Sequence, residues 1–119
     1  MKTIFLVDDS TSIRNIVKGS LTKDYQVIEA EHGQDALDRL AAGAAADLFL
    51  LDVNMPVMDG LTLLGRIKAD ARFKSTPVLM LTTETNNERR AEAKALGAAG
   101  WILKPCDPER LLGALKTFL

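Results

Sequence analysis

Three aspartates of this 119-residue sequence directly follow runs of apolar residues, which is an unusual place for a charged side chain. Asp8 and Asp9 follow "TIFLV", and Asp52 follows "LFLL". A buried carboxylate is costly unless a cation or hydrogen bonds compensate it. Each of these acids therefore either begins a solvated turn or stands at the mouth of a pocket.

Hydroxyl and ammonium groups follow two later apolar runs in the same way. Thr82 and Thr83 come after "PVLML", and Lys104 comes between "WIL" and Pro105. If these runs are parallel strands of one sheet, their carboxyl ends meet at the same edge. The sequence then predicts three carboxylates, a hydroxyl and an ammonium around one point.

The charges of this predicted cluster favour a bound cation. Two carboxylates about 5 Å apart repel by roughly 3 kcal/mol at an effective dielectric of about 20. With three acids, either one is protonated or a cation lies among them, and Lys104 alone cannot neutralise all three. Hard carboxylate oxygens at an open, hydrated site suit Mg²⁺. A carboxylate beside the metal can attack phosphorus, which makes Asp52 a candidate for forming an aspartyl phosphate, with Thr82 and Lys104 near the phosphoryl oxygens.

The composition is that of one globular domain, with 47% hydrophobic and 26% charged residues. A net charge of −1 provides no basic field for nucleic acid. The single cysteine, Cys106, excludes an internal disulfide and a multi-cysteine metal site. We find no apolar run of about 20 residues and no signal peptide. We therefore expect one cytoplasmic domain over residues 1–119, with no output domain and no nucleic-acid or membrane partner.

Five short apolar runs alternate with helical patterns. The predicted strands cover residues 3–7, 26–30, 48–51, 77–81 and 101–103. Four amphipathic stripes predict helices, formed by Ile13, Ile16, Val17 and Leu21; by Ala36, Leu37, Leu40 and Ala41; by Leu61, Leu64 and Ile67; and by Leu111, Leu112, Leu115 and Phe118. Residues 88–96 also have helical propensity, but their apolar stripe is mostly alanine, so this helix should be the most loosely held. Gly43, Gly97 and Gly100 are expected at helix ends.

This alternation predicts an α/β fold with a five-stranded parallel sheet and helices on both faces. Right-handed crossovers and the chain length favour the flavodoxin-like strand order 2-1-3-4-5. Ligands in such sheets bind outside the carboxyl ends of the strands, at the switch between the first and third strands. The three aspartates fall at that switch point.

The motifs "VDDS", "LLDVNMPVMDG", "VLMLTTE" and "GWILKP", in this order and spacing, resemble those of the receiver domains of two-component response regulators. The resemblance covers the whole chain and is greatest to the stand-alone, CheY-like receivers of chemotaxis. It implies that Asp52 is the phosphoacceptor, that Asp9 binds Mg²⁺ directly and Asp8 through water, and that Asn54 offers its backbone carbonyl to the metal. Thr82 and Lys104 would contact the phosphoryl group, with Thr83 beside them, and the bond between Lys104 and Pro105 would be cis.

The resemblance also implies how a signal would pass through the domain. Trp101 stands where the family has its switch aromatic. Asn54 and Glu84, two residues beyond Asp52 and Thr82, resemble the residues of fast-dephosphorylating regulators.

A CheA-like histidine kinase would be the phosphodonor. The downstream protein would bind the helix at 88–96, the strand at 101–103 and the last helix. The enterobacterial chemotaxis regulator has lysines on that face, where this chain has Asn86, Asn87, Ala114 and Thr117. Binding to a flagellar motor switch and phosphorelay to a histidine phosphotransfer protein therefore both remain open.

Some of these residues could have purely structural roles, and the whole site could serve functions other than phosphorylation. Asp8 and Asp9 could serve only to cap a helix, and Trp101 could be an ordinary packed aromatic. A haloacid-dehalogenase-type hydrolase needs a second aspartate two residues after its nucleophile, where this chain has Asn54. In a flavodoxin-like cofactor binder, the acidic segment "DDSTS" would repel the flavin phosphate, and the sequence has no phosphate-binding glycine motif. A receiver that had lost phosphorylation would not need the full set of acids, threonine and lysine. We therefore expect a signalling switch rather than an enzyme.

Overall fold

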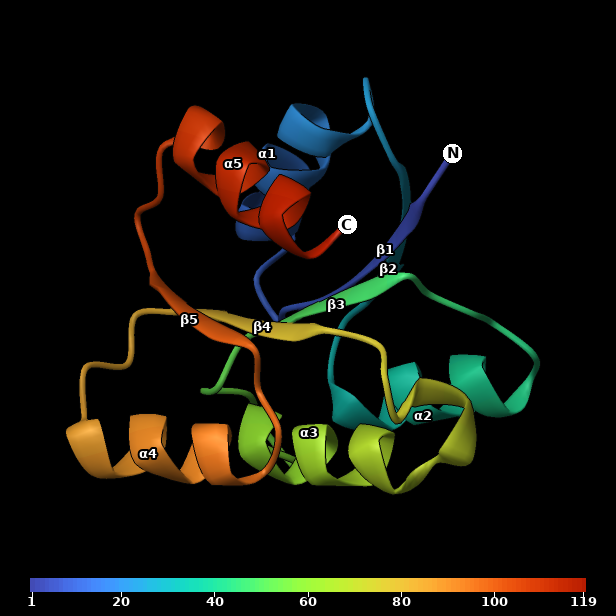
Figure 1. Ribbon diagram of the computed structural model, residues 1–119, viewed down its shortest axis with the longest axis vertical. Helices are drawn as coiled ribbons and strands as arrows, with labels where there is room; N and C mark the ends of the chain where they lie inside the picture. Colours follow the sequence, from blue (N-terminus) through green and yellow to red (C-terminus); the bar gives the residue numbers. More distant parts are fainter.

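The computed structural model describes all 119 residues and has a five-stranded parallel sheet at its centre (Figure 1). The strands are β1 (Thr3–Val7), β2 (Gln26–Ala30), β3 (Leu48–Leu51), β4 (Val78–Thr82) and β5 (Gly100–Leu103). Their order in the sheet is β2-β1-β3-β4-β5, and every neighbouring pair is parallel. The predicted fold class and strand order are confirmed.

Helices cover both faces of this sheet. Figure 1 shows α1 (Thr11–Leu21) and α5 (Pro108–Phe118) on one face, and α2 (Gly33–Ala41), α3 (Gly60–Ala69) and α4 (Asn87–Ala95) on the other. A short 3₁₀ helix, Ala71–Phe73, follows α3. The central strands β3 and β4 are buried at every position, as expected for strands packed on two sides. Two apolar cores result, one on each face of the sheet.

Side chains at the loop–helix junctions satisfy the first free amides of the helices. The Ser10 hydroxyl accepts a hydrogen bond from Ile13 N, and His32 Nδ1 accepts one from Asp35 N. The two glycines Gly43 and Gly97 end α2 and α4 with φ of 104° and 106°, a conformation that side chains disfavour. The ends of α2 and α4 therefore agree with the ends predicted at Gly43 and Gly97.

Several local predictions are wrong, among them the burial of the stripe residues Ala41 and Phe118, which are both exposed. Gly100 was expected to end a helix, but it begins β5, where an added Cβ would lie 2.9 Å from Leu79 Cδ2. Ile16 was expected in the buried stripe of α1, but it is 65% exposed, and Arg14 is buried instead. The fourth strand is shifted by one residue, so that it includes Thr82.

The helix α4 is attached to the rest of the domain by few apolar groups. Ala93 is its only buried residue, which agrees with the alanine-rich pattern in the sequence. None of the helices has the length and apolar character needed to cross a bilayer.

Candidate functional site

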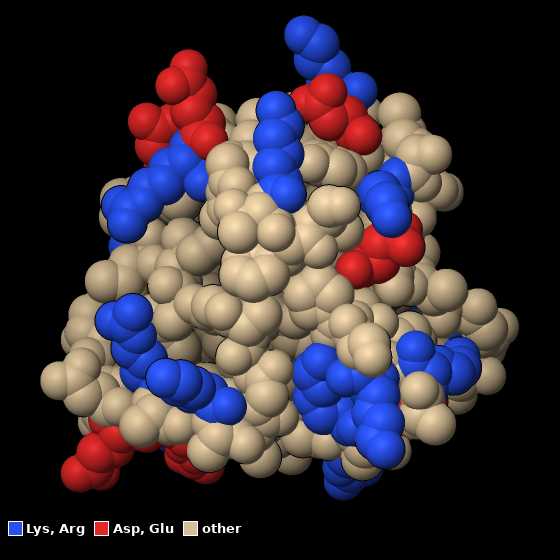
Figure 2. All heavy atoms as spheres, viewed as in Figure 1, with Lys and Arg blue, Asp and Glu red and all other residues tan.

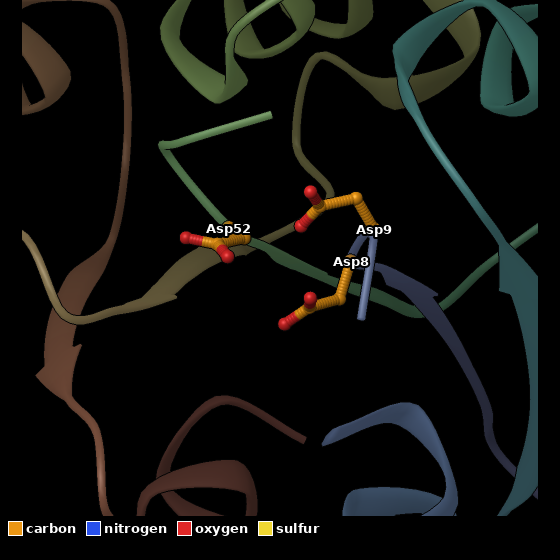
Figure 3. Close-up of side chains that lie close together, drawn as sticks. All are labelled: Asp8, Asp9 and Asp52. Atoms are coloured by element: carbon orange, nitrogen blue, oxygen red, sulfur yellow. The ribbon is translucent and has the colours of Figure 1, made fainter. Parts of the chain in front are cut away.

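Three carboxylates meet at the carboxyl edge of the sheet. Asp8 and Asp9 follow β1, Asp52 follows β3, and these two strands are neighbours. One oxygen of each carboxylate lies within 4.8 Å of the others, and Figure 3 shows the three side chains together at the strand ends. Asp8 and Asp52 are buried, whereas Asp9 is exposed. The structure thus brings together the acids that the sequence places at the switch point.

Lys104 supplies the only ammonium that contacts this cluster. Its Nζ lies 2.5 Å from Asp8 Oδ2 and 3.1 Å from Asp52 Oδ2. Burial by itself would lower the pKa of Lys104, but the hydrogen bond to Asp8 and the charges of Asp52 and Asp8 hold that pKa above its ordinary value. The lysine therefore remains charged, and it bridges the ends of β1 and β3. Its peptide bond to Pro105 is cis.

Backbone amides bind the remaining oxygens of the two buried acids. Ser10 N donates to Asp8 Oδ1 at 2.9 Å, and Asn54 N donates to Asp52 Oδ1 at 3.3 Å. The Asp9 carboxylate has neither a hydrogen bond nor an ion pair. Since one ammonium cannot balance three carboxylates, the cluster stays negative. Oxygen donors, excess negative charge and one uncommitted carboxylate fit a hard divalent cation such as Mg²⁺.

A glycine allows α3 to begin directly against the backbone of Asp52. A Cβ added to Gly60 would lie 2.0 Å from the backbone oxygen of Asp52. The amide of Gly60 donates to Val53 O at 2.8 Å, which fixes the close approach of the two segments. The sequence analysis did not predict a role for Gly60. The only indication of it in the sequence is that Gly60 ends the motif "LLDVNMPVMDG".

The two predicted hydroxyl residues, Thr82 and Thr83, differ in burial. Thr82 is fully buried as the last residue of β4, and its Oγ1 accepts a hydrogen bond from Glu84 N at 3.1 Å. Thr83 is exposed. Thr82 is therefore the hydroxyl placed on the sheet edge beside the acids.

Glu84 connects the loop after β4 to two other predicted residues. Its backbone oxygen accepts a hydrogen bond from Trp101 Nε1 at 3.2 Å, and its Oε2 accepts one from Asn54 Nδ2 at 3.5 Å. Trp101 is partly buried and packs against the core on the α2, α3 and α4 face. The loop between β4 and α4 thus contacts both Asn54, two residues after Asp52, and the aromatic residue of β5.

Comparison with known proteins identifies the family and the fold. A family described as "Response regulator receiver domain" matches residues 4–116. The chain is 38% identical over 118 residues to chemotaxis protein CheY1 of Helicobacter pylori, covering 98% of this chain and 95% of that protein. It is 35% identical to a CheY homolog of Campylobacter jejuni, covering 98% and 91% of the two chains.

Solved structures agree with these relatives. Chemotaxis protein CheY4 of Vibrio cholerae superposes with a TM-score of 0.94 at 44% identity, covering 100% of this chain and 99% of that one. The BeF3-activated receiver domain of DrrB superposes with a TM-score of 0.88 at 30% identity, covering 99% and 97%.

Proposed function

The chain belongs to the response regulator receiver family, and we propose that it acts as a stand-alone, chemotaxis-type switch in which Asp52 accepts a phosphoryl group from a histidine kinase. The observation that carries this proposal is the cluster of Asp8, Asp9 and Asp52 within 4.8 Å, bridged by Lys104 at the carboxyl edge of the sheet. The chemotaxis proteins among its relatives support this role and a cytoplasmic location.

In the proposed reaction, a carboxylate oxygen of Asp52 attacks the phosphorus of a phosphohistidine as the bond from phosphorus to the histidine nitrogen breaks. Asp8, Asp9, Asp52 and the backbone carbonyl of Asn54 would hold Mg²⁺. When bound, this ion neutralises negative charge on the phosphoryl oxygens. Lys104 pairs with Asp52 Oδ2, which supports the proposal that it contacts the new phosphoryl group.

The same contacts suggest how phosphorylation alters the surface. We propose that the phosphoryl group draws the Thr82 hydroxyl towards it and so moves the loop that contains Glu84. Because Trp101 donates to the Glu84 carbonyl, this aromatic side chain would follow the loop. One hydrogen bond to a charged group contributes about 1.5–3 kcal/mol. Moving an equilibrium from 1:99 to 99:1 needs about 5.5 kcal/mol, which is more than the Thr82 hydrogen bond provides. The contact between Lys104 and the phosphoryl group therefore has to contribute as well.

The surface formed by α4, β5 and α5 is the proposed site for the downstream protein. A hollow of about 400 Å³ lies between α4 and β5, and its lining includes alanines, Trp101, Arg90 and Lys94. Figure 2 shows basic side chains over the lower part of this view, where Figure 1 places α2, α3 and α4, and both basic and acidic side chains over the upper part. Leu103 and Phe118 add exposed apolar area on β5 and α5. A flagellar motor switch and a histidine phosphotransfer protein are both candidate partners, and a CheA-like kinase is the candidate donor.

Labelling with a small acyl phosphate tests the assignment of Asp52. Asp52→Asn should abolish incorporation of phosphate, and a metal chelator should abolish it in the wild type. Asp59→Asn is the matched control, because Asp59 lies on the same loop outside the cluster and asparagine also caps helices. Labelling that persists in Asp52→Asn would move the acceptor elsewhere.

The same experiment measures the lifetime of the phosphoryl group. The polar side chains Asn54 and Glu84 face each other beside the acidic site, which supports a role in admitting the hydrolytic water. We propose a short-lived signal, and a half-life of hours would contradict it.

A further inference from the structure

Arg14 is the only buried basic residue of the chain, with 8% of its surface exposed. A buried guanidinium requires both a counter-charge and hydrogen-bond acceptors. Its Nη1 donates to the backbone oxygen of Asp8 at 2.6 Å, and its Nη2 donates to Thr11 Oγ1 at 3.3 Å. Its Nε lies 3.5 Å from Glu29 Oε1. One side chain thus joins the end of β1, the first turn of α1 and β2.

The hydrogen bond to Asp8 acts on the peptide that connects two acids of the site. The carbonyl of Asp8 belongs to the planar peptide bond between Asp8 and Asp9, so holding its oxygen restricts the orientation of the whole plane. Together with the φ rotation of Asp9, that orientation sets the direction in which the Asp9 side chain leaves the backbone. The Asp8 carboxylate is also held by Ser10 and Lys104, whereas the Asp9 carboxylate has no hydrogen bond of its own. The position of Asp9 therefore depends on its backbone.

We propose that Arg14 is a positioning residue for the metal site, which orients the peptide between Asp8 and Asp9 so that the Asp9 carboxylate is held facing Asp52. This inference rests on the proposed Mg²⁺-dependent function. Glu29 pairs with both Arg14 and Lys18, so replacing each cation in turn separates an effect of charge beside Glu29 from the geometric role proposed for Arg14. Residues that hold a metal ligand in place typically change metal affinity by 10- to 100-fold when they are replaced.

Lys18 provides a matched control on the same helix. Its Nζ pairs with the same carboxylate, Glu29, at 3.1 Å, but it makes no contact with Asp8. Arg14→Met and Lys18→Met each remove one cation beside Glu29 and leave an unbranched apolar side chain. Only the first removes the hydrogen bond to the Asp8 carbonyl.

The experiment is Mg²⁺ titration of the unphosphorylated protein by calorimetry, with the folded fraction of each variant checked by circular dichroism. Arg14→Met should weaken Mg²⁺ binding by about tenfold, and Lys18→Met should bind Mg²⁺ as the wild type does. The NMR signal of the Asp9 amide should shift in Arg14→Met and stay in place in Lys18→Met. If Arg14→Met does not fold, Arg14→Lys takes its place, because an ammonium keeps the charge but cannot form the planar fork.

Three results would overturn the inference. The first is a folded Arg14 variant with wild-type Mg²⁺ affinity, even if its stability has fallen. The second is an equal loss of affinity in Lys18→Met, which would assign the effect to charge beside Glu29. The third is a wild-type chain that binds no Mg²⁺, and this result alone would also remove the proposed function.

Discussion

Replacement of Gly60 by alanine tests whether the start of α3 sets the position of Asp52. The added Cβ would lie 2.0 Å from the Asp52 backbone oxygen, 2.8 Å from its carbonyl carbon and 2.9 Å from Val53 Cα. These are backbone atoms, so rotation of a side chain cannot relieve the contact. Because real Cβ contacts stay above 3.0 Å, the contact at 2.0 Å requires α3 or the end of β3 to move by about 1 Å.

The expected effect is larger on phosphorylation than on folding. Overpacking of this kind costs about 1–3 kcal/mol. A domain of this size has a stability of about 5–15 kcal/mol, so the variant should still fold. With a shift of about 4 °C per kcal/mol, Tm should fall by about 4–12 °C. A displacement of about 1 Å at a reacting group can lower its rate by about 100-fold, and Asp52 is the group displaced here.

Thermal unfolding and the rate of labelling by a small acyl phosphate measure the two effects. Gly65→Ala is the control, because Gly65 lies in the same helix and the nearest atom to its added Cβ is Leu96 Cδ2 at 3.9 Å. That variant should keep the wild-type rate and gain up to about 1 kcal/mol of stability from helix propensity. Wild-type Tm together with a wild-type labelling rate in Gly60→Ala would refute the reasoning.

Two further predictions concern charged residues. Lys104→Met should lower the free energy of unfolding by about 3–5 kcal/mol in chelator, because it leaves the buried acids without their ammonium. Urea denaturation should show a smaller loss of unfolding free energy in millimolar Mg²⁺ than in chelator. An equal loss with and without Mg²⁺ would contradict the role of the acids in holding the ion. Although partial burial opposes the shift, hydrogen bonds from Thr62 and the charge of Arg89 lower the pKa of Asp59 in the folded protein. The stabilisation from ionised Asp59 is therefore present above its unfolded pKa of about 3.9 and is lost as pH falls through the lower folded value. The difference in unfolding free energy between wild type and Asp59→Asn should shrink as pH falls through that acidic range. A difference that stays constant with pH would refute this stabilising role of ionised Asp59.

Much of the fold was predictable because its signals are local. The runs at 3–7 and 48–51 are apolar without alternation, which is the pattern of strands covered on both faces, and the structure buries them between two helical layers. The rule that ligands lie at the carboxyl edge of a parallel sheet then placed Asp8, Asp9 and Asp52 together, as the structure confirms. Their chemical roles remain predictions from the family resemblance.

Residue types and their order along the chain thus determined the strands, their sequence in the sheet and the acids at its edge. Only the tertiary structure decided that Arg14 is buried and Ile16 exposed, because the rotation of α1 about its axis depends on acceptors supplied by Asp8 and Glu29. It also decided that residue 60 has to be glycine, because the space there is set by the distance between α3 and the backbone of β3. Apolar periodicity indicates which side chains are buried, but it does not indicate how closely two segments distant in the sequence approach each other.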